Sequence, residues 1–469
     1  MRTLSLAARN LLRNRRRSLA TLLAMAIGSA SILVFGGYST NIEYSMQTAY
    51  VRSGGHLQIQ HRDFYHYGSG NPTAYGVADY EKIVDAIRKD EVLRDMVLVV
   101  TPTLQFGGIA GNYAAGVSRT IVGVGLVAAD HQRMREWNDF NLPLILPPFP
   151  LKGAAADTAI VGTGLARVLR LCQTLQVAEC PEPEKESVRE GTAVPDDIAQ
   201  LSLQETPAAS ASASGSASSS QGRIELLAST AHGAPNVSAV EVVRAEPQGF
   251  KELDDVLVAI HLQQAQRLIY GTTPPSVTSI MVQLRHSYQI PRSRARVTSL
   301  LSTLSPGQPL SVLDFRSLNP FYVQTQQLFD TIFGFIYCLI GSIVLFTVGN
   351  TMNMAVVERT VEIGTLRAMG LRRSGIRRLF VLEGMMLGLC GAIAGAVCAL
   401  SVSFIVNEMG LTWLPPGSSL YLPLTLRIWG ENRLIFGTTF GLIIIATLSA
   451  WWPAYRAAKM VVVDALRHA

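Results

Sequence analysis

The chain has 469 residues, of which 48% are hydrophobic and only 16% are charged, and its mean hydropathy is +0.26. Soluble proteins carry about 25% charged residues, so this composition excludes an ordinary soluble protein. The 40 Lys and Arg residues outnumber the 34 Asp and Glu residues, which gives a formal net charge of +6. Such an excess is typical of nucleic-acid binding or of an anionic membrane surface, and the position of the charges decides between the two.

Four apolar runs are long enough to cross a bilayer, which takes about 20 helical residues. They are Leu19–Tyr38, Leu328–Met354, Leu379–Val406, which contains Glu383 as its one acidic residue, and Leu434–Trp452. A cleaved signal peptide is the alternative for the first run, because Ala24-Met25-Ala26 resembles a cleavage site. The apolar stretch continues well past that point, so we expect an uncleaved membrane anchor.

Arginines cluster beside these runs, before the first run and between the second and third runs. The two clusters are Arg9, Arg13, Arg15, Arg16 and Arg17, and Arg367, Arg372, Arg373, Arg377 and Arg378. Basic residues at these places are typical of cytoplasmic segments. The pattern predicts that both termini are cytoplasmic and that residues 41–325 face outward, and it argues against nucleic-acid binding.

Small residues recur along the third run at about the spacing of a helical turn: Gly384, Gly388, Gly391 and Gly395. Small residues at this spacing indicate helix packing, because they let two backbones approach closely. Packing within the chain and an interface between subunits both fit the pattern.

The outward region reads as an α+β domain in two lobes. Alternating apolar and polar residues predict strands at 56–60, 96–103 and 279–284, and amphipathic patterns predict helices at 79–89 and 253–270. An insert at about 181–222 begins acidic and becomes almost pure Ala, Ser and Gly, so we expect it to be disordered. A tract rich in Leu and Pro, 140–151, is either a loop that contacts lipid or a partner, or a buried structural loop.

Metal and disulfide chemistry is sparse. His56, His61 and His66 lie close in sequence, but their spacing puts successive histidines on opposite faces of a strand, so we expect ordinary surface histidines and no metal site. Cys172 and Cys180 form a candidate disulfide if the exterior is oxidising.

Enzyme signatures are also missing from the sequence. There is no GxxxxGK[ST] phosphate loop, no GxSxG elbow and no HExxH motif. We therefore expect no catalytic residues, no bound cofactor and no ATP hydrolysis by this chain.

One segment, at about 356–370, has the character of a docking helix. Read as a single helix, it places Glu358, Arg359 and Glu362 on one polar side, with Arg359 within reach of Glu362, and it ends at Gly370. A short helix of this kind at a membrane surface fits a groove on a partner protein. The alternative is an interfacial helix that lies passively on lipid.

The same segment carries a resemblance to a known family. The pattern Glu358-Arg359-x-x-Glu362-Ile363-x-x-Leu366-Arg367-Ala368-x-Gly370, followed by Leu382-Glu383-Gly384 and by Pro453-Ala454-x-Arg456-Ala457-Ala458, resembles the FtsX-type permeases of the type VII ABC superfamily. This group includes the MacB efflux pumps and the lipoprotein-releasing LolC and LolE subunits. The resemblance covers about residues 325–469, and Ile160-Val161-Gly162-x-Gly164-Leu165-Ala166 resembles a weaker motif of the periplasmic core.

The resemblance implies a multi-pass protein of the bacterial inner membrane. Its parts would be a cytoplasmic N-terminus with the first transmembrane helix at 1–40, a MacB-like periplasmic domain at 41–325, and an FtsX-like permease domain at 326–469. The partner would be a separate cytoplasmic ATPase, present in two copies that bind ATP and Mg. The residues that couple the permease to it would be Glu358, Arg359, Glu362, Ile363, Leu366, Arg367, Ala368 and Gly370. A second permease copy or a sister permease would complete the dimer, and a periplasmic adaptor or lipoprotein is a further expected partner.

The function that this resemblance implies is mechanotransmission, in which ATP hydrolysis on the partner moves the outer domain. Release of a lipoprotein or another amphiphile, or efflux, is the leading expectation. A signalling module that controls a periplasmic cell-wall hydrolase, as FtsX does, is the alternative, although the size of the outer region favours a transporter. A membrane receptor without an ATPase would leave the docking segment unexplained.

Overall fold

The computed structural model describes residue 9 and residues 15–143, 147–178, 180, 222–414 and 422–460. The predicted disordered insert therefore lies, apart from its last residue, outside the described residues. The chain divides into two compact units. We call them the membrane unit, with Met1–Gln47, Phe321–Trp413 and Leu422–Ala469, and the sheet domain, with Thr48–Pro320 and Leu414–Tyr421.

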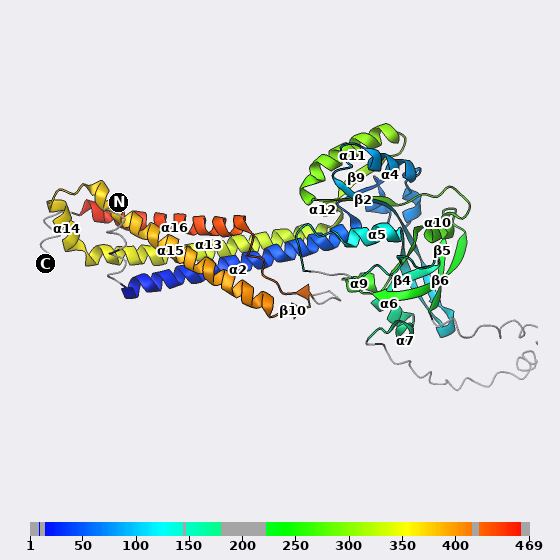
Figure 1. Cartoon of the computed structure of the whole chain (residues 1–469), viewed down its shortest axis with the longest axis horizontal. Coiled ribbons are helices and arrows are strands. Elements are labelled where there is room, and N and C mark those ends of the chain that lie inside the picture. Colours follow the sequence, from blue (N-terminus) through cyan, green and yellow to red (C-terminus); the bar gives the residue numbers. More distant parts are fainter. Residues whose placement is uncertain are drawn as a thin grey trace, which may run out of the picture. The chain divides into compact units, whose positions relative to one another are not determined.

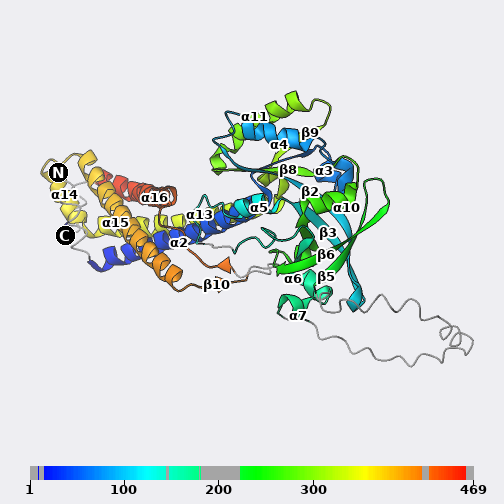
Figure 2. The same ribbon diagram turned by 45° about the vertical axis from the view of Figure 1, so that its right-hand side comes forward.

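The membrane unit is built from long apolar helices, as the four runs predict. Within the described residues, four helices are long and apolar enough to cross a membrane: α2 (Arg15–Gly54), α13 (Pro320–Glu358), α15 (Arg373–Glu408) and α16 (Asn432–Lys459). They run alongside one another in Figures 1 and 2, with the short helix α14 (Thr360–Ala368) at one end of the bundle. A small pairing of β10 (Thr412–Trp413) with β11 (Leu422–Pro423) follows α15.

The glycines of α15 face two different helices of the same chain. A Cβ added at Gly384 would lie 2.4 Å from Ala450 Cβ on α16, and one added at Gly395 would lie 2.4 Å from Ser29 Cβ on α2. Gly388 and Gly391 likewise face α16 and α2. Of the two interpretations of the glycine pattern, this structure places the residues in packing within the chain.

We expect Gly384→Ala to destabilise the membrane unit by about 1–3 kcal/mol, because the new methyl group overpacks the contact with α16. Gly437→Ala is the matched control on α16, since a Cβ there meets nothing within 4 Å. It should be neutral or stabilising by up to about 1 kcal/mol, as alanine is the better helix former. Thermal unfolding of the purified chain in detergent measures both. Equal effects of the two substitutions would contradict the packing role of Gly384.

The sheet domain contains a nine-stranded sheet among its described residues, in the order β3-β7-β4-β6-β5-β2-β8-β1-β9. The strands are β1 (Leu57–His61), β2 (Val97–Asn112), β3 (Val117–Leu126), β4 (Thr158–Gly162), β5 (Arg223–Ser229), β6 (Pro235–Glu246), β7 (Leu257–His261), β8 (Ser279–Leu284) and β9 (Leu310–Asp314). An additional pairing of β2 with β3 closes six of them into a ring. The strands predicted around 56–60, 96–103 and 279–284 are confirmed.

Helices and turns join these strands. They are α3 (Phe64–Tyr67), η1 (Pro72–Tyr75), α4 (Tyr80–Lys89), η2 (Tyr113–Ala115), α5 (Ala128–Arg135), α6 (Thr163–Val168), α7 (Cys172–Leu175), α9 (Lys251–Asp254), α10 (Leu262–Tyr270), η3 (Ser287–Gln289), α11 (Ile290–Leu304) and α12 (Phe315–Leu318). The amphipathic helix α4 buries Ile83, Val84 and Ile87 in one core with Leu57, Ile59 and the strands beside them. The helix predicted at 79–89 is confirmed.

The single helix predicted at 253–270 is wrong in its first half. The structure has a turn of helix to Asp254, then the buried strand β7, and only then α10. The run Val256-Leu257-Val258-Ala259-Ile260 explains the difference, since β-branched residues favour a strand between two neighbours, here β3 and β4. Its apolar residues fit a helical pattern equally well in sequence, so periodicity alone does not separate the two.

The motif around Gly162 and Gly164 has a packing explanation. The buried Asp254 carboxylate accepts hydrogen bonds from the backbone N–H groups of Thr163 and Gly164, each at 2.9 Å, and from the Thr163 hydroxyl. Side chains would block this approach, because a Cβ at Gly162 would lie 2.1 Å from Asp254 O and one at Gly164 would lie 1.9 Å from Asp255 Oδ1. Asp254 thus satisfies the free donors that begin α6.

Two further features complete the sheet domain. Cys172 and Cys180 form a disulfide with a Cα–Cα distance of 6.1 Å. The 140–151 tract, of which 144–146 lie outside the described residues, buries Leu142, Phe149 and Leu151. Its described part therefore fits the buried structural loop rather than a surface that contacts lipid.

Candidate coupling site

The docking segment consists of two pieces rather than one helix. Helix α13 ends at Glu358, Arg359 leaves the helical conformation with φ −107° and ψ 19°, and α14 begins at Thr360. At the other end Gly370 adopts φ +93° and donates its N–H to Arg367 O, while Leu371 N–H reaches back to Leu366 O. This is a Schellman motif, which requires a left-handed residue and therefore favours glycine.

An ion pair lies beneath this segment. Arg359 Nη1 donates to Glu383 Oε1 of α15 at 3.0 Å, and only 6% and 2% of the two side chains are exposed. Ile363, on the same side of α14, is buried in the core that the four long helices share. A buried charge is costly unless it is paired, so the pair ties the start of α14 to α15.

The opposite side of α14 is open. Glu362, Thr365 and Ala368 are exposed, and so are the apolar side chains of Val361 and Met369. This mixture of apolar and acidic groups on one side of a short helix is suited to a partner surface.

The remaining predicted residues hold the segment in place. Glu358 Oε1 lies 2.8 Å from Arg17 Nη2 of α2. Arg367 Nη1 donates to Met460 O just beyond α16, and Leu366 is half-buried. The loop between α13 and α15 is thereby connected to both of the other long helices.

Sequence reasoning found the segment but misplaced Arg359. The sequence pattern places Arg359 on an exposed polar side of the segment, whereas in the structure its side chain is buried and pairs with Glu383 of α15. The helix break at Arg359 changes the direction of its side chain, and a spacing rule for one continuous helix does not hold across a break. A signal was available: Glu383 is the one acid in its apolar run, and an acid there needs a cation.

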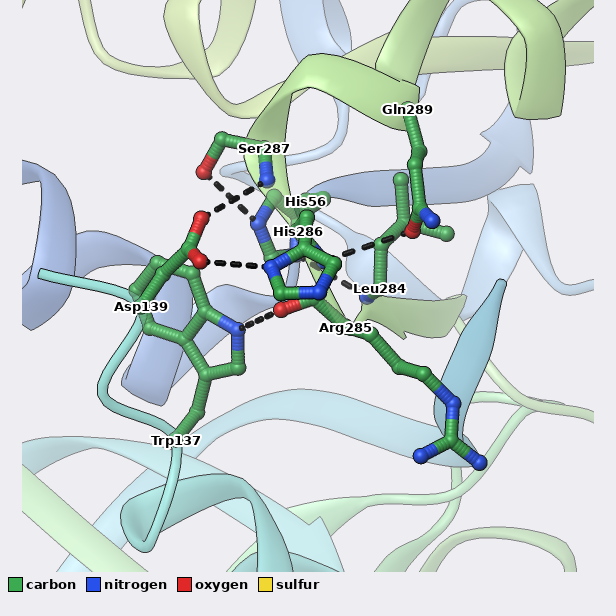
Figure 3. Close-up of polar contacts among 8 residues, drawn as sticks. All are labelled: His56, Trp137, Asp139, Leu284, Arg285, His286, Ser287 and Gln289. Atoms are coloured by element: carbon green, nitrogen blue, oxygen red, sulfur yellow. Dashed lines mark hydrogen bonds and ion pairs between the residues drawn. The ribbon is translucent and has the colours of Figure 1, made fainter. Parts of the chain in front are cut away.

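A polar cluster in the sheet domain was not anticipated (Figure 3). His56 is fully buried. Its Nδ1 accepts a hydrogen bond from the Leu284 N–H at 3.0 Å, and its Nε2 lies 3.2 Å from Ser287 Oγ. Because Nδ1 accepts, the ring proton sits on Nε2 and is donated to the hydroxyl. Trp137 packs edge-on against His56 at 4.9 Å, and burial lowers the pKa of His56 to about 3.

Asp139 organises the neighbouring turn in the same view. Its carboxylate accepts from Ser287 N–H at 3.1 Å and lies 2.7 Å from His286 Nδ1. The expectation that the three early histidines are surface residues is wrong for His56, since the ring enters the core, and holds for the exposed His66. Within the described residues, no three His, Cys, Asp or Glu side chains gather as a metal site.

Comparison with known proteins places the membrane unit. Residues 334–462 match the family described as FtsX-like permease C-terminal, and this range covers most of α13, α14, α15 and α16. This stretch of the chain is similar to the FtsX-like permeases of ABC transporters.

Curated proteins that are similar to this chain include several transporter proteins. The lipoprotein-releasing system transmembrane protein LolC of Neisseria meningitidis serogroup B is 27% identical over 50% of this chain and 56% of its own length. The ABC transporter permease YtrF of Bacillus subtilis is 33% identical over 28% of this chain and 31% of its own. The macrolide export ATP-binding/permease protein MacB of Escherichia coli O157:H7 is 30% identical over 40% of this chain and 27% of its own length. The chain thus spans about a quarter to just over half of these relatives.

Proposed function

We propose that this chain is the permease subunit of an ABC transporter and passes the motion of a separate ATPase to the sheet domain. The observation that carries the proposal is α14. Its inner side is fixed to α15 through the buried Arg359–Glu383 pair, and its outer side presents exposed apolar groups and the acidic Glu362. A partner that pushes on the outer side would move α15 through this connection.

The partner would be a cytoplasmic ABC ATPase, with two copies that bind ATP and Mg. In this arrangement both termini and α14 lie in the cytoplasm of a bacterial inner membrane, and the sheet domain lies in the periplasm. The arginines that surround α14 support this orientation. A second permease copy or a sister permease would complete the dimer.

The class of cargo is a finer proposal. The names of the relatives point to release of a lipoprotein in the case of LolC and to export of a macrolide in the case of MacB. Both cargoes are amphiphilic, so we propose that the periplasmic motion extracts or expels an amphiphile, with an adaptor or lipoprotein as a further partner.

Co-purification tests the ATPase proposal directly. The tagged chain is isolated from gently solubilised membranes, and its partners are quantified by mass spectrometry. We expect a stoichiometric ABC ATPase with the natural chain. With Glu362→Lys, the amount of bound ATPase should fall at least about tenfold, because the reversed charge faces the docking surface. A tenfold fall corresponds to about 1.4 kcal/mol of binding free energy. Glu252→Lys on α9 is the control, an exposed glutamate reversed in the sheet domain.

Two results would count against this function. If no ATPase accompanies an intact dimer, the chain acts as a receptor without an ATPase. If the ATPase is retained equally by Glu362→Lys and the control, α14 is not the docking element. Recovery of the ATPase together with a cell-wall hydrolase, and no lipoprotein or adaptor, would favour the signalling alternative over transport.

A further inference from the structure

One side of α16 is exposed and apolar along the length of the helix. Its residues recur every four positions, which is close to one helical turn, so they form a continuous stripe. The stripe consists of Phe436, Phe440, Ile444, Leu448 and Trp452. A stripe of this length on a helix that can span a bilayer is suited to contact with acyl chains.

The stripe ends in stacked aromatic and basic side chains. The Arg456 guanidinium lies 3.8 Å from the centroid of the Trp452 ring, and Lys459 Nζ lies 4.5 Å from that of Tyr455. From the neighbouring helix α15, the Arg377 guanidinium lies 5.3 Å from the Trp451 ring centroid. A guanidinium stacked on a ring is held in place while its in-plane N–H donors stay available to an anion.

The surroundings of these cations are strongly basic. Arg372, Arg373 and Arg378 add exposed positive charges at the beginning of α15. The acidic side chains described at this end are fewer than the basic ones: Glu358 is bridged to Arg17, Glu383 is buried with Arg359, and Glu362 is exposed on α14. The field at the end of the stripe is therefore positive.

We propose that Arg377, Trp451, Trp452 and Arg456 form a binding site for the phosphate headgroup of an anionic phospholipid. The two arginines bind the phosphate with charge-assisted hydrogen bonds, and the acyl chains lie along the α16 stripe. A phospholipid is the one occupant that matches both the positive end and the apolar length of this surface. The site goes beyond the proposed function, because it does not depend on docking of an ATPase.

Native mass spectrometry of the full-length chain tests the site. The chain is released from mixed micelles that contain phosphatidylglycerol or phosphatidylcholine with identical acyl chains, and the retained lipids are counted. We expect preferential retention of phosphatidylglycerol by the natural chain. Arg377→Gln/Arg456→Gln should weaken retention roughly 30-fold, which corresponds to about 2 kcal/mol for two basic residues near the headgroup.

Controls separate this site from general charge effects. Lys82→Gln/Lys89→Gln removes the same charge from exposed positions on α4 and should retain phosphatidylglycerol as the natural chain does. Trp452→Leu keeps the stripe apolar but removes the ring under Arg456, so we expect a two- to fivefold weaker retention. This variant keeps the test informative if the double arginine variant does not fold.

Several outcomes would overturn the proposal. Equal retention of the two lipids, or equal loss in the α4 control, would mean a non-specific lipid layer. Complete competition by free inorganic phosphate would mean an anion site that needs no lipid. A change in the mass of the oligomer with Trp452→Leu, with no change in the lipid count, would mean that the stripe is an interface between copies of the chain.

Discussion

Glu383→Leu should destabilise the membrane unit by about 3–5 kcal/mol, because it leaves the Arg359 guanidinium buried without its carboxylate. Thermal unfolding of the detergent-purified chain measures the effect. Glu362→Leu removes a glutamate from the exposed side of α14 and is the matched control. It should change the free energy of unfolding by no more than about 0.5 kcal/mol, as is usual for surface positions.

Together with the single variants Arg359→Met and Glu383→Leu, the double variant Arg359→Met/Glu383→Leu completes a double-mutant cycle. It removes both charges, and a buried ion pair is often replaceable by apolar residues at little cost, so most of the lost stability should return. Under the proposed function, the double variant should still dock the ATPase but should not transmit its motion, and ATP-driven transport measures this. If the two single changes simply add, Arg359 and Glu383 do not act as a pair.

Acid should weaken the sheet domain well above the pH at which carboxylates titrate. Burial lowers the pKa of His56 from 6.5 to about 3, so near pH 6 the unfolded chain binds a proton that the folded chain does not. The stability that the neutral His56 contributes is fully present above about pH 6.5. It is lost as the pH falls toward 3, at about 1.4 kcal/mol per pH unit. Between pH 6.5 and 4.5, His56 alone should cost about 2–3 kcal/mol.

His131 on α5 adds to the same loss of unfolding free energy as the pH falls. Burial and the nearby Arg135 lower its pKa to about 4, and its ring packs 4.8 Å from Phe149. Unfolding free energies over this pH range, followed by near-UV circular dichroism, should therefore show uptake of more than one proton. His131→Phe should remove the part of the pH dependence of the unfolding free energy that His131 causes, and His56→Gln should remove the part that His56 causes. A slope that neither substitution changes would show that other groups govern the acid sensitivity.

Much of the membrane unit could be predicted because the bilayer constrains it. A span needs about 20 apolar residues, and the four runs in the sequence lie within α2, α13, α15 and α16. The glycine spacing on α15 also predicted close contact, although the sequence did not say which helices lie opposite. The contacts of Gly384 with α16 and of Gly395 with α2 depend on the rotation of α15, which a pattern in one helix does not contain.

The less predictable features depend on pairs of residues far apart in the chain. Arg359 and Glu383 meet only because the chain turns back at Gly370, and His56 is buried only because Trp137 and Leu284 come to it from other elements. The misassigned stretch before α10 has the same origin, since β7 is a strand because β3 and β4 flank it. Local periodicity describes the face of an element and says little about its neighbour.

The long strand β2 belongs both to the ring of six strands and to the remaining part of the sheet. Its first half pairs with β8 between Val97 and Thr103, and its second half pairs with β3 from Leu104 onward and with β5 between Gly108 and Gly111. A pull on β1, which follows directly after α2, therefore passes through β8 into β2 and from there into the ring without crossing a loop. Under the function proposed above, a displacement of β1 would reach the ring through the backbone hydrogen bonds of paired strands.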